Sequence, residues 1–451
     1  MDPWLDKNIN ELWYCCPCLY QQAWKKTYEQ NTDYQHIIPK KAKGIRGHIS
    51  QAYDIDNQQQ QGTTKDIINL WERTYKHFSW HRIAPYNRKG DFNRPYLLFK
   101  SKNVTAPEVR QKKWDKARPI APQTKHPMSK LFHLAGRAWS FITSQIPGEH
   151  FTLNKAGQLL DFFTEVENKL AIQGEIKVEA KDIEGCFCNM PKDAISEGLQ
   201  HITELIKTNL GYTAVYVPCR GKHPCQWKQR KGYKELKFSD LLDIMNFALN
   251  NTLIKHLDGR LYKQVRGIPM GDPHSPGMCI GACAYMEKKW IQTLPLEFKK
   301  KMLAKRYMDD VLIFSIKYLD VNTPLQECYN KPLTLEETKN DTFLETSFKI
   351  VNNKIQHWLK NENDHQQHKV WRYAHFHSNM AFKQKKAVLQ ACLRKVHLAA
   401  SDNHHRRKSA IQKLQEFGRL QYPYKLLWTL CTTMGVQTRN AVWFQIRDDM
   451  R

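Results

Sequence analysis

The sequence has no long apolar run, few acidic residues for its size and no regular cysteine pattern. No stretch approaches the roughly 18 consecutive apolar residues of a membrane-spanning helix, so we expect no membrane partner. The first residues, MDPWLDKNINELW, are polar and partly acidic, which is unlike a secretory signal. Twelve cysteines at irregular spacing and without such a signal favour a reduced, intracellular environment.

No group of cysteines and histidines in the sequence has the spacing of a zinc site. The cluster Cys15-Cys16-Pro17-Cys18 and the pair Cys219 and Cys225 around His223 are the groups that come nearest to one. Neither group has a second half at the usual distance along the chain. We therefore expect ordinary reduced thiols at these positions.

Acidic residues are outnumbered by basic ones. The chain has 44 Asp and Glu against 70 Lys and Arg, which gives a formal net charge of +26. Such an excess favours a polyanionic partner, because each neutralised phosphate releases counterions. A basic protein unrelated to nucleic acid is the alternative that composition alone leaves open. The 13 Trp, 19 Tyr and 19 Phe offer faces for base stacking, although we expect most of them in the core.

The 451 residues suffice for two or three domains or for one large core with several lobes. Strict alternation predicts a strand over 176–182, and the apolar run 311–314 predicts another. Residues 211–232 are basic, contain Pro and Gly, and read as a loop. Apolar periodicity predicts helices over 67–78, 129–142, 193–210, 241–253, 276–294, 381–400 and 405–420.

Two adjacent carboxylates, Asp309 and Asp310, fall at a predicted turn between two short apolar strands. They repel each other unless a cation binds them, and Mg²⁺ prefers a few carboxylates, waters and substrate phosphates. Two such ions can activate a primer 3′-hydroxyl and stabilise a leaving pyrophosphate. A third carboxylate should end a neighbouring strand, as Asp182 does, with Glu184 a weaker candidate. The alternative for Asp182 is a loop or helix-capping role.

A segment rich in Gly and Pro, 264–276, lies between these acids and leads into a predicted helix of small residues. Its glycines let a backbone approach a nucleotide or template closely. Taken alone, the segment fits an ordinary loop as well as it fits a nucleotide- or template-binding segment. Its position between the strand that ends in Asp182 and the turn at Asp309 makes the three elements far more specific together than apart.

In this order the three elements resemble the palm motifs of reverse transcriptases. Residues 182–187 are similar to motif A, 267–276 to motif B, and Arg306-Tyr307-Met308-Asp309-Asp310 to motif C. Ala117-Arg118-Pro119-Ile120 resembles the fingers motif whose Arg holds the incoming triphosphate. The resemblance extends over residues 110–430.

Within that family the chain is most similar to Penelope-like elements, which are related to telomerase reverse transcriptases. Asp272 stands where this group usually has Ser, and Glu345 stands where it has Asp. The likeness is carried by four segments: 247–267, 270–276, 333–345 and 375–388.

The resemblance implies an α+β right-hand polymerase fold. Residues 1–110 would be an N-terminal extension that binds RNA or belongs with the fingers. Residues 111–350 would form the fingers and a palm with an antiparallel sheet, and 351–451 a basic helical thumb. The implied activity is RNA-directed DNA synthesis by a retroelement of Penelope-like type, with an RNA template, a DNA or RNA primer and dNTPs as partners.

The resemblance also implies the roles of the site residues. Asp182, Asp309, Asp310 and the carbonyl of Ile183 would bind two Mg²⁺ ions, for which Mn²⁺ can substitute.

Arg118, together with Lys116, would hold the triphosphate, and Gly271 would shape the nucleotide pocket. Phe187 lies five residues after the first Asp of motif A, where RNA-dependent RNA polymerases usually have a second Asp. A ring at that position would clash with a ribose 2′-hydroxyl and admit a deoxynucleotide; the alternative is an ordinary core Phe. Lys339 and Lys349 are alternative proton donors to pyrophosphate, and an ordinary solvated lysine is the competing interpretation of each.

Two rival functions stay open from the sequence. One is an RNA-dependent RNA polymerase, which the sugar of the accepted nucleotides would distinguish. The other is a domesticated polymerase fold that binds nucleic acid without synthesis, and the intact acids Asp182, Asp309 and Asp310 argue against it.

Overall fold

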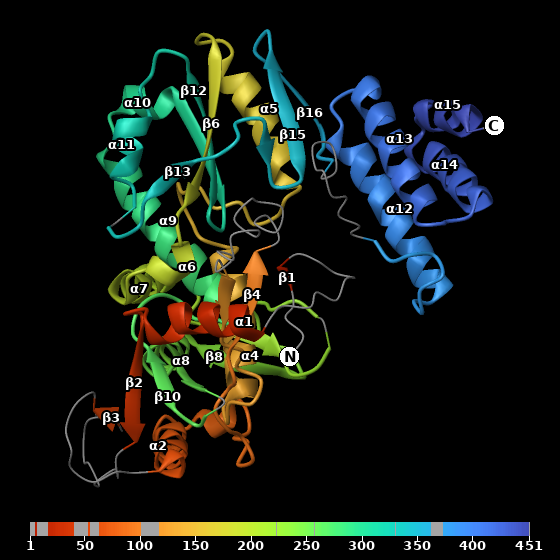
Figure 1. The fold of residues 1–451 in the computed structure, drawn as a ribbon. Helices are drawn as coiled ribbons and strands as arrows, with labels where there is room; N and C mark the ends of the chain where they lie inside the picture. The colour runs from red at the N-terminus through yellow and green to blue at the C-terminus, as the bar shows by residue number, and fades with distance from the viewer. Residues whose placement is uncertain are drawn as a thin grey trace.

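The computed structural model describes residues 5–6, 17–39, 53–54, 63–100, 117–221, 223–256, 258–329, 331–361 and 373–450. A sheet with its helices forms one lobe, N-terminal and middle segments form a second, and the C-terminal helices form a third (Figure 1). Among the described residues, no helix combines the length and the apolar character needed to cross a bilayer.

The main sheet has four strands in the order β11-β12-β6-β13, and all neighbours are antiparallel. The hairpin of β11 and β12 turns at Met308 and Asp309, which confirms the turn expected from the sequence. The strand predicted over 176–182 is also confirmed, as β6. The strands are β6 (Ile176–Ile183), β11 (Met302–Tyr307), β12 (Asp310–Ile316) and β13 (Leu335–Glu337).

Both faces of this sheet are covered, which explains the continuous apolar run of β12. Val311 and Ile313 face the core shared with helices α4, α7, α8 and α9, whereas Leu312 and Phe314 face α5 and the hairpin β15–β16. The covering elements are α4 (Ser129–Thr143), α5 (Gln158–Leu170), α7 (Lys192–Leu210), α8 (Phe238–Asn250), α9 (Ser275–Thr293), β15 (Thr346–Val351) and β16 (Lys354–Leu359).

The described parts of the first 110 residues are built into the same body. Ile67 and Trp71 of α2 (Thr64–His77) belong to the core of α7 and α9. Strand β2 pairs with β10, and β4 pairs with β5, so both sheets join early and later segments. The strands are β2 (Tyr34–Pro39), β3 (Tyr53–Asp54), β4 (Tyr96–Lys100), β5 (Ala117–Ile120), β9 (Leu253–Lys255) and β10 (Leu261–Gln264).

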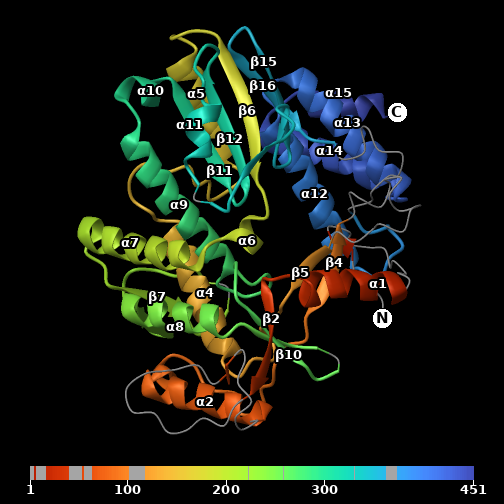
Figure 2. The same ribbon diagram turned by 60° about the vertical axis from the view of Figure 1, so that its left-hand side comes forward.

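The C-terminal helices have a core of their own, which includes the fully buried Trp443. They lie beside the β15–β16 hairpin in both views (Figures 1 and 2). His357 of β16 joins the two lobes, because its ring nitrogen lies 2.8 Å from the carbonyl oxygen of Ala399. The helices are α12 (Phe382–Ala399), α13 (Asn403–Arg419), α14 (Tyr424–Thr438) and α15 (Val442–Asp449).

The loop predicted over 211–232 is partly wrong. Residues Ala214–Pro218 form strand β7, which pairs with β8 (Tyr233–Lys237). The remaining short elements are β1 (Leu5–Asp6), α1 (Pro17–Trp24), the π-helix η1 (Lys25–Glu29), the 3₁₀-helix η2 (Trp80–Arg82), α6 (Cys186–Asn189), α10 (Leu296–Lys300), α11 (Asn322–Gln326) and β14 (Thr342–Phe343).

Candidate active site

A cavity of about 1900 Å³ opens where the ends of β6, β12 and β13 meet β5 and the loop before α9. Ile183 is fully buried beside it, and Lys116 lies outside the described residues. The structure thus brings together side chains from distant parts of the sequence. The expected site residues that line the cavity are Arg118, Asp182, Phe187, Gly271, Asp309 and Asp310.

Three carboxylates form a row across the sheet and line this cavity. The register places Asp310 of β12 opposite Asp182 of β6, and Asp182 opposite Glu336 of β13. Side chains directly opposite in antiparallel strands project to the same face, with Cβ atoms about 5 Å apart. Asp309 adds a fourth carboxylate from the turn. Glu336 was not among the site residues expected from the sequence, because only the pairing of β13 with β6 brings it here.

The backbone of Ile183 also faces the turn. Its amide donates to the carbonyl oxygen of Asp309 at 2.9 Å. Because the N–H and C=O of a strand residue point to the same side, the Ile183 carbonyl is directed toward motif C as well. Carboxylate and carbonyl oxygens are the hard donors that Mg²⁺ accepts, so this donor set fits the expected ion. Glu184 is engaged elsewhere, since its carboxylate accepts a hydrogen bond from Thr334 at 3.1 Å.

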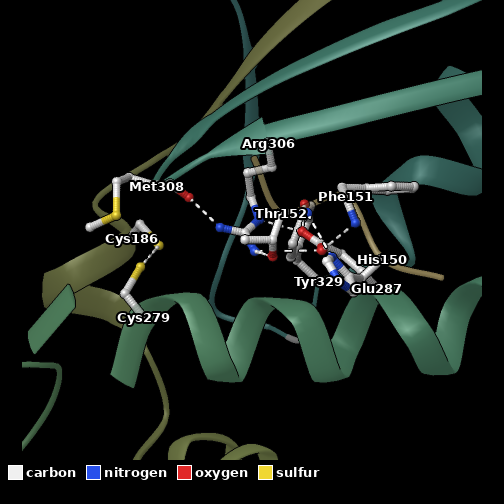
Figure 3. A network of polar contacts seen from close by, with 9 residues as sticks. All are labelled: His150, Phe151, Thr152, Cys186, Cys279, Glu287, Arg306, Met308 and Tyr329. Atoms are coloured by element: carbon white, nitrogen blue, oxygen red, sulfur yellow. Dashed lines mark hydrogen bonds and ion pairs between the residues drawn. The ribbon is translucent and has the colours of Figure 1, made fainter. Parts of the chain in front are cut away.

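A buried arginine supports the turn from behind (Figure 3). Met308 has a left-handed backbone, with φ of +59°, and its carbonyl oxygen accepts a hydrogen bond from Arg306 at 2.8 Å. The fully buried guanidinium also donates to Thr152 at 3.1 Å and forms an ion pair with Glu287 of α9. Arg306 therefore ties the turn to the helix packed beneath it.

Glu287 is held in turn by two further donors, the amide of Phe151 at 2.9 Å and the hydroxyl of Tyr329 at 3.0 Å. Burial raises the pKa of Glu287, and the Arg306 guanidinium opposes that shift. A buried ion pair with this many hydrogen bonds has its polar atoms well satisfied. Nothing in the sequence pattern had singled out Glu287, which lies in the middle of a predicted helix.

Solved structures show what this arrangement resembles. No protein family matches the sequence, and no curated protein matches it. Telomerase from Candida albicans, in complex with a TWJ fragment of telomeric RNA, aligns with a TM-score of 0.52 and 12% identity. The alignment covers 85% of this chain and 64% of that one. The chain has a right-hand polymerase fold.

Two further structures align with lower scores. Telomerase from Candida tropicalis with a TWJ fragment has a TM-score of 0.45 and 13% identity, and covers 82% of this chain and 59% of its own. The Sicinivirus 3Dpol RNA-dependent RNA polymerase has a TM-score of 0.44 and 14% identity, and covers 98% of this chain and 87% of its own. This chain thus spans less than two thirds of each of these telomerase chains.

The loop before α9 packs directly against the segment that follows the motif A strand. Gly267 has φ of +76°, and a Cβ atom there would lie 2.4 Å from the carbonyl oxygen of Cys188. The next amide, of Ile268, donates to the carbonyl oxygen of Phe187 at 2.6 Å. The position of the Phe187 ring at the cavity is therefore coupled to this loop.

Gly267→Ala should lower the free energy of unfolding by about 1–3 kcal/mol, because a left-handed backbone and a backbone clash must both be accommodated. Chemical denaturation measures the change. Gly418→Ala is the matched control, since a Cβ there, within α13, would meet nothing within 4 Å. Equal effects of the two substitutions would contradict the coupling.

Asp272 has a structural role in this loop. Its carboxylate accepts the amide of His274 at 2.8 Å and lies 2.6 Å from the ring Nδ1 of the same residue. Both side chains are fully buried at the start of α9. The Asp–His pair thus fixes the loop on which Gly271 faces the cavity.

Some of the basic residues expected at the site line the cavity, and one lies in another strand. Arg118 of β5 and Lys339, just after β13, both line the cavity. Lys349 lies in β15 opposite Gln356 of β16. Of the two lysines considered as proton donors, Lys339 is the one at the cavity wall.

Proposed function

We propose that the chain is an RNA-directed DNA polymerase that extends a primer 3′-hydroxyl with dNTPs on an RNA template. The observation that carries this proposal is the convergence of Asp182, Asp309 and Asp310 in one cavity with Arg118. A polymerase fold that had lost synthesis would have no need to keep three like charges side by side. We also propose that the chain comes from a retroelement of Penelope-like type. This part of the proposal rests only on the four sequence segments that resemble that group.

The chemistry of the site would divide among few residues. Asp182, Asp309, Asp310 and the Ile183 carbonyl would hold two Mg²⁺ ions, or Mn²⁺ in their place, which supply activation of the 3′-hydroxyl and stabilisation of the leaving pyrophosphate. Arg118, which also lines the cavity, would neutralise the triphosphate as charge develops.

The thumb of this polymerase would be α12–α15. These helices carry many of the chain's excess cations, and contacts to a duplex backbone are independent of sequence.

Primer extension tests the proposal. The purified chain, with Mg²⁺ and a primer annealed to RNA or DNA, should incorporate dNTPs on the RNA template, and Asp309→Ala should abolish the product. Extension with NTPs in preference to dNTPs would identify an RNA-dependent RNA polymerase instead. Tight binding without extension, by a protein with intact acids, would favour the nucleic-acid-binding alternative.

Phe187→Ala should weaken the discrimination between deoxyribonucleotides and ribonucleotides. The half-buried ring lines the cavity, and its backbone is fixed by the loop before α9. Removing a steric block of this size should raise the relative use of ribonucleotides on the order of ten- to two-hundredfold. Competition between dNTPs and NTPs in single-turnover extension measures it. Phe141→Ala, another cavity-lining Phe, is the control; if both variants keep the wild-type ratio, Phe187 is not the gate.

A further inference from the structure

Three buried cysteines meet between the catalytic strand and α9. Cys186 begins α6, three residues after β6 ends, and Cys279 and Cys283 lie one turn apart on α9. The three Sγ atoms all lie within 4.8 Å of one another, and Cys186 and Cys279 approach to 3.5 Å. Figure 3 shows the thiols of Cys186 and Cys279 directed toward each other.

The spacing of these sulfurs suits a shared cation. A Zn–S bond is about 2.3 Å long, so neighbouring sulfurs around a tetrahedral zinc ion are about 3.8 Å apart. The observed separations of 3.5 Å to at most 4.8 Å bracket that value. A disulfide needs an S–S distance of about 2.0 Å and would leave the third thiol unused.

The surroundings also favour a soft cation over other ligands. All three side chains are at most 2% exposed, and two come from one helix at the i, i+4 spacing that directs ligands to one side. Thiolates select zinc and similar soft ions over Mg²⁺.

We propose that Cys186, Cys279 and Cys283 supply three thiolate ligands to one Zn²⁺-like cation. The ion ties α6 to α9 and so fixes the strand that ends in Asp182 and Ile183 relative to the helix that follows the motif B loop. Along the chain, Cys186 and Cys279 are 93 residues apart, so no spacing rule detects the site. The proposal is independent of the polymerase activity, since its readouts are metal content and stability.

The competing explanation is simple packing. Cysteine is small and apolar enough to fill a tight helix interface, and α9 contains many small residues. In that case the thiols bind no metal, and alanine at these positions changes stability only through lost contacts.

The experiment uses the full chain in its reduced state, with accessible thiols such as Cys18 and Cys219 first alkylated in the folded protein. After dialysis with Zn²⁺ and then without it, metal is counted by mass spectrometry. Cd²⁺ titration then follows the ultraviolet thiolate-to-metal band and the melting temperature. The double variant Cys279→Ala/Cys283→Ala is compared with Cys392→Ala/Cys431→Ala, which removes two buried thiols of the C-terminal lobe.

The wild type and the C-terminal control should each retain one cation per chain and melt at higher temperature with Cd²⁺. The palm variant should lose the cation, the band and the shift in melting temperature. Cys186→Ala provides a second, milder variant with the same expected loss if the double variant fails to fold. A wild type that retains no cation, or a Cys186→Ala variant that retains it fully, overturns the proposal.

Discussion

Asp182→Asn should lower the rate of primer extension by about a thousandfold, since the proposed function gives this carboxylate a share in metal binding, and its loss would remove several kcal/mol of transition-state stabilisation. Asn keeps the shape of the side chain and removes its charge. The residue stands directly opposite Asp310 and next to Glu336 in the register, so it is the centre of the carboxylate row. Its replacement should affect the reaction more than the fold.

The strand register also predicts that Asp182→Asn lowers activity without lowering stability. Neighbouring like charges destabilise a folded sheet, so Asp182→Asn should leave the free energy of unfolding unchanged or raise it by up to about 1 kcal/mol. Asp193→Asn, in the first turn of α7, is the matched control and should keep full activity. Single-turnover extension and denaturation are measured on both variants. An active Asp182→Asn protein would remove Asp182 from the site.

Much of the palm could be predicted from the sequence because its signals are local. The alternation of β6, the apolar run of β12 and the turn between the two hairpin strands each depend on a few consecutive residues. The helices α12 and α13 were likewise predicted to within a few residues. Once these elements were in place, the order of the acids was enough to bring Asp182 toward Asp309.

The parts that could not be predicted depend on pairing between distant segments. Glu336 joins the carboxylate row only because β13 pairs with β6, and its own neighbours carry no such signal. The five residues of β7 stand among Gly, Pro and Lys, a composition that predicts a loop, yet pairing with β8 makes them a strand. The three-thiol cluster is likewise a product of tertiary packing.

The ion pair of Arg306 and Glu287 behind the turn also joins distant segments, so the sequence does not predict it. Breaking it should have a large effect on the free energy of unfolding. Glu287→Gln should lower the free energy of unfolding by about 3–5 kcal/mol, because the buried Arg306 guanidinium then lacks its counter-charge. Tyr329→Phe, which removes one hydrogen bond from the same carboxylate, should cost only about 1 kcal/mol. Denaturation of both variants measures the difference, and equal losses would contradict the ion-pair explanation.

A double replacement distinguishes two roles of Arg306, its contribution to the stability of the fold and its effect on the position of the turn. Arg306→Met with Glu287→Leu removes both charges, and buried pairs replaced by apolar residues of similar size often regain stability. Activity should not return with it, because the carbonyl of Met308 has lost its donor and the left-handed turn that carries Asp309 is free to shift. We expect the free energy of unfolding to recover only in part, because the Phe151 amide and the Tyr329 hydroxyl lose their acceptor. Extension should be reduced at least about tenfold in kcat with little change in the KM for dNTP. Recovery of both stability and kcat would show that Arg306 serves the fold alone, whereas recovery of stability only would assign it the positioning of the catalytic turn.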